Sequence, residues 1–465
     1  MADAIKLFEI GSPEFNGFFA RLRSRAEQSD APVGAANGEL LERVRAGGDA
    51  MAIMFAEAFF EGLHPTAQAS VERIIDRVRT QGDAALCNLT RLFDGFPLTA
   101  ATIRVSPKEL DTAAAQADSS LLDLCRKQVL PRLMRFHERQ KCESWQIDES
   151  GGSVGMRIQP LSRVALYVPG GKAFYPSSLM MCAIPAKVAG VKEIAVFTPP
   201  GSFEKTPLLA ALLKELGITE VYRVGGAQAV AAAALGTDKV ARVDKIVGPG
   251  SLFVALAKRM LYGRLDIDNF AGPSEVVVLF DASANPAYVA ADLLAQAEHD
   301  ELAAAVAVTD NPDAATAVAV EVEKQLAGLP RESIARKSLE SYGGIVVAPS
   351  LGFAVRFADT LAAEHVEILT EQAEQHAAQM KNAGAIFIGP HAPEAFGDYC
   401  AGPNHVLPTC GTARFSSALS VSDFVRQVSI IRGSPELLKA NREAILKLAR
   451  AEGLEAHARS VEKRF

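Results

Sequence analysis

The sequence has no uninterrupted apolar run close to the ~18 residues that a membrane-spanning helix needs. It also has no long run of lysine or arginine, and its formal net charge is −7. The concentrated positive charge that a phosphate backbone requires is therefore missing. These absences argue against a membrane span and against a nucleic-acid partner, so we expect a small-molecule ligand.

Cysteine is sparse and scattered, with six residues in the chain and no Cys-x-x-Cys pair. The first residues lack the basic segment and cleavage pattern of a secretory signal. We therefore expect reduced thiols and a cytoplasmic protein. Hydrophobic residues make up 49% of the 465 residues, which is ample for buried cores, and this length favours about two to four domains.

From about residue 163, short apolar runs alternate with helix-compatible stretches. RVALYVPGG, EIAVFTPPG, VYRVGGA and VDKIVGPG each precede such a stretch, and the alternation resumes at EVVVLFD. This alternation is typical of βαβ units and a parallel sheet. We expect an α/β protein with two Rossmann-like, incomplete parallel-sheet domains and smaller helical segments at the N- and C-termini.

The expected organisation has four parts. Residues 1–61 form a helical N-terminal segment, and residues 417–465 form a C-terminal helical tail. Residues 62–166 and 274–416 form the first α/β domain, which carries the candidate metal and acid–base residues. Residues 167–273 form the second α/β domain.

The N-terminal segment shares a near-repeat with the neighbouring part of the chain. LERVRAGGDAM at 41–51 resembles IDRVRTQGDAA at 75–85. Two copies are too few for a solenoid, which needs three or more stacked units. The similarity indicates either a local duplication or a chance likeness between two helix–turn segments.

Three of the expected strands end in Gly-Gly or Gly-Pro-Gly. Such turns place backbone N–H groups at helix N-termini, where an anionic group such as a pyrophosphate can bind. None of them reads Gly-x-Gly-x-x-Gly, so the standard dinucleotide fingerprint is absent. The turns are compatible with a nucleotide site and equally with simple tight connections.

Six polar residues that lie far apart in the chain combine metal-ligand and proton-transfer types: Gln296 and His299 in LLAQAEHDE, the adjacent Glu364 and His365, Asp398, and His457. Residues three apart share a helix face, so the glutamine and the first histidine can reach one ion. Two imidazole nitrogens, a carboxylate and an amide oxygen suit zinc, and manganese or cobalt second. Each of these types is also common as an ordinary packed or solvated side chain, above all a histidine near a terminus.

Seven segments together resemble the histidinol dehydrogenase family: YVPGGKAFYPSS, VGGAQAVAA, AGPSE, QAEHD, EHVEILT, GDYCAGPNHVLPTCGTARFSSALSV and EGLEAHAR. They succeed one another at family-like spacing from about residue 65 to the end. The resemblance implies a zinc- and NAD-dependent four-electron oxidation of L-histidinol to L-histidine through L-histidinal, the last steps of histidine biosynthesis. It also implies a homodimer with exchanged C-terminal segments, in which the tail of one subunit completes the zinc site of the other.

The resemblance assigns roles to individual residues. The ligands of one Zn²⁺ per subunit are Gln296, His299, Asp398 and His457. The substrate contacts are Ser274, Gln296, His299, His365, Asp398, His405, Glu452 and His457. The NAD contacts are Tyr167, Gln228 and position 251, here Ser251. For the chemistry, His365 is the candidate general base for alcohol oxidation, and Glu364 is the candidate for activating the water that oxidises the aldehyde.

Four positions depart from the family pattern. Ser251 stands where an asparagine usually contacts NAD, and a hydroxyl lacks the two-sided hydrogen-bonding capacity of an amide. Ala363 stands where proline is common, and Cys182 and Ser422 replace an expected asparagine and tyrosine. None of the four removes a metal ligand or an acid–base residue.

Three other functions stay open. The same fold and cofactors can serve a dehydrogenase of another small alcohol, such as a sulfonated diol, but Glu452 and His405 favour histidinol. A metal-dependent hydrolase would use the same ligands without a nucleotide, and the strand-end glycines argue against it. A non-catalytic binding protein has no need of an acid–base pair beside the ligands.

Overall fold

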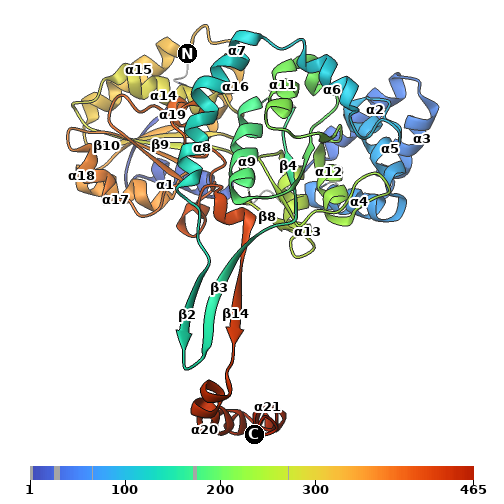
Figure 1. Ribbon diagram of the computed structural model, residues 1–465. Coiled ribbons are helices and arrows are strands. Elements are labelled where there is room, and N and C mark those ends of the chain that lie inside the picture. Colours follow the sequence, from blue (N-terminus) through green and yellow to red (C-terminus); the bar gives the residue numbers. More distant parts are fainter. Residues whose placement is uncertain (1–3, 26–31, 65, 171–174, 271) are drawn as a thin grey trace.

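The computed structural model describes residues 4–25, 32–64, 66–170, 175–270 and 272–465. Two α/β lobes lie side by side, and an arm extends away from them (Figure 1). Parts of two motifs, residues 171–174 of YVPGGKAFYPSS and residue 271 of AGPSE, lie outside the described residues. Within the described residues, no helix is both long enough and apolar enough to cross a membrane.

The first lobe is built on a six-stranded parallel sheet with the order β1-β11-β10-β9-β12-β13. Its central strands are continuous apolar runs, as expected when helices cover both faces of a parallel sheet. The strands are β1 (Leu7–Glu9), β9 (Glu275–Phe280), β10 (Ala304–Thr309), β11 (Gly344–Val347), β12 (His365–Leu369) and β13 (Ala385–Ile388).

Helices cover both faces of this sheet. One face packs against α14 (Pro286–Ala297), α15 (Pro312–Leu326) and α16 (Glu332–Tyr342). The other face packs against α1 (Pro13–Ser24) and α17 (Leu351–Leu361). Two short helices, α18 (Ala373–Ala377) and α19 (Glu394–Tyr399), come after β12 and β13.

The second lobe is built on a five-stranded parallel sheet with the order β6-β5-β4-β7-β8. The strands are β4 (Arg163–Tyr167), β5 (Glu193–Phe197), β6 (Glu220–Tyr222), β7 (Lys245–Val247) and β8 (Asp266–Ile267). One face packs against α4 (Ala67–Gln81), α5 (Asp83–Asp94), α12 (Gly226–Leu235) and α13 (Leu252–Leu261). The prediction of an α/β protein with two parallel sheets is confirmed.

The other face of the second sheet carries a longer series of helices. They are α6 (Pro107–Ala114), α7 (Ser119–Leu124), the π-helix η1 (Cys125–Val129), α8 (Leu130–Glu138), α9 (Pro176–Ala189), α10 (Ser202–Lys205) and α11 (Pro207–Glu215). Cys182, one of the departures from the family pattern, is fully buried in α9.

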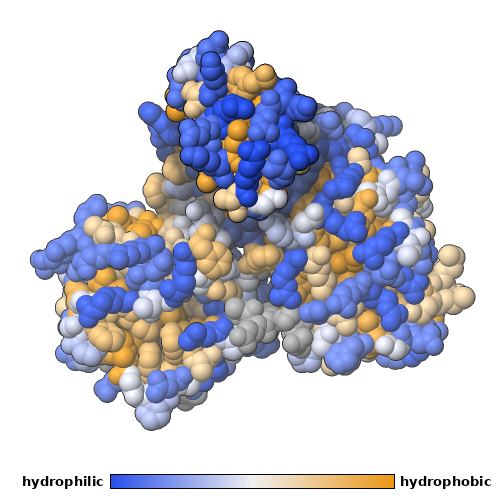
Figure 2. Space-filling model, turned by 90° about the horizontal axis from the view of Figure 1, so that it is seen from below, coloured by the Kyte–Doolittle hydropathy of each residue, from blue (hydrophilic) through white to orange (hydrophobic). Residues whose placement is uncertain are grey.

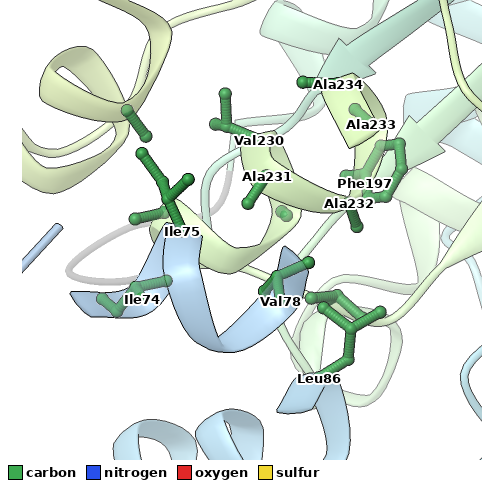
Figure 3. Close-up of a cluster of buried hydrophobic side chains, with 14 of the residues drawn as sticks. Ile74, Ile75, Val78, Leu86, Phe197, Val230, Ala231, Ala232, Ala233 and Ala234 are labelled. Atoms are coloured by element: carbon green, nitrogen blue, oxygen red, sulfur yellow. The ribbon is translucent and has the colours of Figure 1, made fainter. Parts of the chain in front are cut away.

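Helix α4 shows which lobe the segment 62–166 joins. Its apolar positions Val71, Ile74, Ile75 and Val78 recur at helical spacing and form one buried stripe. Figure 3 shows Ile74, Ile75 and Val78 beside the alanine-rich run 230–234 of α12, whose small side chains let the two helices approach closely. The expectation that residues 62–166 belong with residues 274–416 is therefore wrong for these helices, which pack on the second sheet.

The segment 1–61 was expected to be helical, but it also contains a strand. β1 adds an edge strand to the first sheet beside β11. The near-repeat forms two helical hairpins, α2 (Gly34–Ala46) with α3 (Ala50–Phe60), and α4 with α5. In each hairpin the glycine of the shared Gly-Asp turn has a positive φ, +72° at Gly48 and +54° at Gly82. The two similar sequences therefore make the same helix–turn–helix structure.

The arm is a three-stranded antiparallel sheet of order β14-β3-β2 that carries two helices at its end (Figure 1). Its elements are β2 (Trp145–Glu149), β3 (Gly152–Pro160), β14 (Val425–Arg432), α20 (Pro435–Ala451) and α21 (Glu455–Glu462). Two 3₁₀ helices, η2 (Thr412–Arg414) and η3 (Val421–Phe424), precede β14. The expectation of a purely helical tail is wrong, because VRQVSIIR pairs along its whole length with residues 153–160.

Candidate active site

The candidate catalytic residues lie at the amino edge of the first sheet. Ser274 precedes β9, and Glu364 and His365 stand at the start of β12, the strand hydrogen-bonded to β9. Helix α14 connects β9 to β10 and so ends near the same edge, with Gln296 in its last turn and His299 just beyond it. Parallel pairing and one crossover helix thus bring together residues that are far apart in the sequence.

Three side chains at this edge form a group that can hold a metal ion. The ligand atoms of His299, Glu394 and Asp398 lie within 4.8 Å of one another. His365 adjoins the group, with Nε2 4.0 Å from Oδ1 of Asp398 and Nδ1 3.9 Å from Oε1 of Glu394. Two imidazoles and two carboxylates therefore share one small volume.

Gln296 supplies an independent sign that a ligand belongs here. Its side chain is fully buried, one helical turn before His299, and neither Oε1 nor Nε2 has a hydrogen-bond partner among the described residues. A buried amide left without a partner costs about 1–3 kcal/mol. The donor set of an amide oxygen, an imidazole nitrogen and the Asp398 carboxylate fits zinc chemistry.

Glu364 and His365 form a buried acid–base pair. Oε2 of Glu364 accepts a hydrogen bond from the backbone N–H of Glu275 at 3.1 Å and lies 3.9 Å from Nδ1 of His365. Burial raises the pKa of Glu364 well above its usual value and lowers the pKa of His365 to about 3. The imidazole is therefore neutral at neutral pH and able to accept a proton.

His405 and Ser274 also reach this group. Nδ1 of His405 lies 3.0 Å from the backbone carbonyl oxygen of Asp398, so this nitrogen carries the proton and Nε2 is left as an acceptor. Burial lowers the pKa of His405 to about 4 and raises the pKa of Asp398 to about 6. The hydroxyl of Ser274 hydrogen-bonds the carboxyl group of Glu364.

Glu394, which is 3% exposed, is a member of this group that the sequence patterns did not indicate. Its Oε1 lies 3.9 Å from Nε2 of His299, and its backbone N–H donates to Oε1 of Glu367 at 2.7 Å. Burial and, to a smaller extent, the neighbouring carboxylates raise the pKa of Glu394 well above its usual value. Helical spacing offers a signal for finding it, since Glu394 lies four residues before Asp398 on α19.

Two of the expected site residues do not join the cluster within one chain. His457 lies on α21 and Glu452 at the end of α20, both exposed to solvent. Figure 1 shows these helices at the far end of the arm, away from both lobes. A site that uses them has to take them from another copy of the chain.

The expected NAD contacts belong to the carboxyl side of the second sheet. Tyr167 ends β4, and its hydroxyl accepts the backbone N–H of Gly226, the first residue of α12, at 3.0 Å. Gln228 is buried in the first turn of α12, whereas Ser251 is the exposed N-cap of α13 and its side chain makes no capping hydrogen bond. The helices α12 and α13 thus both begin near the end of β4.

The turn before α13 has no room for a side chain at Gly248. Its φ is +115°, and a Cβ placed there would lie 2.2 Å from the backbone oxygen of Tyr167. Its N–H donates to Asp268 at 2.7 Å, and its carbonyl accepts from Lys258 at 2.5 Å. The buried ion pair between that lysine and aspartate therefore fixes the turn from both sides.

Known proteins resemble the chain over nearly its whole length. The sequence profile of histidinol dehydrogenase matches residues 61–465. The histidinol dehydrogenase of Halalkalibacterium halodurans is 51% identical over 402 residues, which are 86% of this chain and 94% of that protein. The histidinol dehydrogenase of Syntrophotalea carbinolica is 47% identical over 437 residues, or 94% of this chain and 97% of that protein.

A solved structure shows the same fold. The crystal structure of histidinol dehydrogenase from Elizabethkingia anophelis superposes with a TM-score of 0.83 at 30% sequence identity, covering 100% of this chain and 98% of that one. The chain therefore belongs to the histidinol dehydrogenase family, a family of NAD-dependent oxidoreductases.

Proposed function

We propose that this chain oxidises L-histidinol to L-histidine through L-histidinal, the last steps of histidine biosynthesis, with two NAD⁺ and one Zn²⁺ per subunit. The observation that carries the proposal is the convergence of His299, Glu394 and Asp398 beside the buried pair of Glu364 and His365. The activity for which the relatives are named supports the choice of substrate.

The proposed zinc ligands are Gln296, His299 and Asp398, together with His457 of the partner subunit. The unpartnered amide of Gln296 supports this set, because an ion supplies the contact that the buried oxygen lacks. Bound zinc would supply a Lewis acid that holds the imidazole and amine nitrogens of histidinol and orients its alcohol carbon. Glu394 adjoins this set as a further carboxylate.

His365 is the proposed base for alcohol oxidation. The pKa of about 3 that burial gives it leaves the imidazole unprotonated at neutral pH. Nε2, the ring nitrogen on the side of Asp398, takes the hydroxyl proton of histidinol. The hydride that leaves the same carbon goes to NAD⁺.

Glu364 is the proposed residue for aldehyde oxidation. It takes a proton from the water that adds to histidinal, and the hydrated aldehyde then gives up the second hydride to NAD⁺. The backbone N–H of Glu275 and the hydroxyl of Ser274 orient the carboxylate for this transfer. His405, with Nε2 free to accept, and Glu452 of the partner subunit recognise the polar groups of the substrate.

Tyr167, Gln228 and Ser251 are the proposed NAD contacts. They stand where α12 and α13 begin, so backbone N–H groups are available to the pyrophosphate. Ser251 is exposed and its hydroxyl makes no capping bond, which leaves it available to the cofactor.

Exchange of the arm between two copies is also part of the proposal. Its strands expose large apolar side chains: Trp145 at 51%, Ile147 at 57%, Val154 at 43% and Ile431 at 79%. Figure 2, with the end of the arm nearest the viewer, shows apolar surface among the hydrophilic residues of the helices there. A second copy that packs on the arm would cover these groups and order the tail. The six cysteines are free, which fits the proposed cytoplasmic location.

The test is to incubate the purified chain with histidinol, zinc and NAD⁺ and to follow the absorbance of the reduced cofactor. Two reduced cofactors per histidine formed support the proposal. Activity confined to other small alcohols would assign a different substrate to the same site. Product without reduced cofactor would indicate a hydrolase.

A further inference from the structure

Arg25, at the end of α1, is a charged residue that the proposed mechanism does not use. It belongs to the N-terminal segment, before the range 61–465 that matches the family profile. Its side chain is only 1% exposed, although it lies close in sequence to the exposed Arg23. A guanidinium so deeply buried needs partners for its charge and its donors.

The guanidinium makes four hydrogen bonds at the amino edge of the first sheet. Nε donates to the carbonyl of Leu302 at 2.9 Å, and Nη1 donates to Oε2 of Glu275 at 3.1 Å. Nη2 donates to the carbonyls of Pro273 and Ser274 at 3.0 Å and 2.9 Å. One side chain therefore joins the start of β9 to the turn before β10.

The segment held by Arg25 is the one that orients Glu364. Glu275, whose carboxylate pairs with Arg25, donates its backbone N–H to Oε2 of Glu364. Ser274, whose carbonyl also accepts from Arg25, hydrogen-bonds the same carboxyl group through its hydroxyl. Both protein donors to Glu364 that the structure shows thus belong to residues whose position Arg25 fixes.

We propose that Arg25 is a positioning residue for Glu364, so that the N-terminal segment is a working part of the active site. The inference deepens the proposed function and rests on the role of Glu364 in it. Without the guanidinium, the buried carboxylate of Glu275 would lie unpaired close to Glu364, and like charges would push the two groups apart. A misplacement of about 1 Å at a reacting group can lower a rate by ~10²-fold.

Lysine cannot replace Arg25 fully. Its ammonium is a single point charge, whereas the four acceptors lie around a planar fork. Arg25→Lys should therefore keep the pairing with Glu275 and lose most of the carbonyl contacts. This makes it a graded variant between the wild type and Arg25→Met.

The test compares these variants with Arg23→Met, using histidinal and NAD⁺ as substrates. Arg23 and Arg25 both line a cavity of about 410 Å³, but Arg23 is exposed, and its guanidinium lies 5.9 Å from the ring centre of Phe19. We expect kcat per folded enzyme to fall ~10-fold in Arg25→Lys and ~10²-fold in Arg25→Met, with KM for NAD⁺ within about 2-fold. Arg23→Met should match the wild type.

Hydrogen exchange of the peptide 272–280 gives a readout that does not depend on turnover. Exchange there should speed up in the Arg25 variants and stay unchanged in Arg23→Met, because of these two arginines only Arg25 hydrogen-bonds this segment. If Arg25→Met does not fold, the turnover and hydrogen exchange of Arg25→Lys test the inference. Glu275→Gln keeps the side-chain shape but removes the negative charge of the pair. It should also lower kcat, but by a smaller factor than Arg25→Met.

Two results would overturn the inference. One is a kcat within about 2-fold of wild type in folded Arg25 variants, since a purely structural arginine would lower stability and yield but not turnover per folded molecule. The other is unchanged exchange at 272–280. A wild-type chain that reduces no NAD⁺ with histidinol or histidinal would instead refute the proposed function, and the exchange measurement would still test what Arg25 holds.

Discussion

The two parallel sheets of this protein carry their candidate functional groups at opposite edges. In the second sheet, the polar features gather where strands end and helices begin, around Tyr167, Gly226 and Gly248. In the first sheet, they gather where the strands begin, around Glu364 and His365. Ligands of open parallel sheets usually bind at the carboxyl ends of the strands, so the second lobe has the common arrangement and the first does not.

The physical difference between the two edges supports the proposed division between cofactor binding and proton transfer. Helix N-termini at a carboxyl edge offer an anionic cofactor backbone N–H groups, which do not titrate. At the amino edge of the first sheet the polar groups are ionisable side chains, and burial shifts the pKa of His365 to about 3 and that of Asp398 to about 6. Desolvation at this edge keeps His365 neutral and makes the buried carboxyl groups bind protons more tightly, so burial sets the protonation state of each group.

The largest effect should come from the base at the amino edge. We expect His365→Asn to lower kcat by ~10²–10⁴-fold, the usual contribution of a general base. Its zinc content should stay that of the wild type, because His365 is not a proposed ligand. Steady-state kinetics and metal analysis of the purified variant check this. Loss of zinc would mean that His365 has been assigned the wrong role.

The neighbouring carboxylate should affect mainly the second half of the reaction. Glu364→Gln removes the group that takes a proton from water, so oxidation of histidinal should slow ~10²-fold. Oxidation of histidinol to histidinal should slow much less. Single-turnover measurements with each substrate separate the two steps. Equal losses in both would contradict the division of roles between Glu364 and His365.

Gln296 permits a test of the metal site that needs no turnover. Gln296→Leu should weaken zinc binding by at least ~10–100-fold, the range for loss of an outer-shell partner, because Gln296 is a proposed ligand. The same change should stabilise the zinc-free protein by about 1–3 kcal/mol, because it removes a buried amide without a partner. Denaturant unfolding with and without zinc measures both effects. A zinc-free variant less stable than the wild type would show that the amide has a partner within the chain.

The smallest effect should come from the carboxyl edge of the second sheet. Tyr167→Phe deletes one hydrogen bond to the N–H of Gly226, which is worth about 1 kcal/mol. We expect KM for NAD⁺ to rise ~5-fold while kcat stays near that of the wild type. Kinetics at varied NAD⁺ concentration provide the measurement. A large fall in kcat at saturating NAD⁺ would place Tyr167 in the chemistry instead.

The sequence predicted well the features that depend on local patterns. Alternating apolar runs and helices predicted two parallel sheets, and a three-residue spacing predicted that Gln296 and His299 lie one turn apart. Local patterns do not predict the strand β14, because VRQVSIIR is half polar and its partner strand lies some 270 residues earlier in the chain. Its pairing is a long-range contact that local propensity does not encode.

Local sequence patterns also do not predict which element packs against a buried surface. The apolar stripe of α4 shows that one face is buried, but not which sheet buries it, and the expected domain of residues 62–166 was wrong for that reason. No sequence pattern singles out Glu394 as buried, because a lone glutamate is usually solvated. The same holds for Arg25, since its four acceptors are brought to it only by the folded sheet.

The most direct measurement of the central claim, a catalytic centre completed by the arm of a second copy, is activity after coexpression of two inactive variants. One carries His365→Asn in the lobe and the other His457→Ala in the tail. Random pairing makes half of the dimers mixed, and one of the two sites in each mixed dimer has an intact lobe and an intact tail. We predict about a quarter of the wild-type specific activity. Activity no greater than the sum of the two variants made separately would contradict the account.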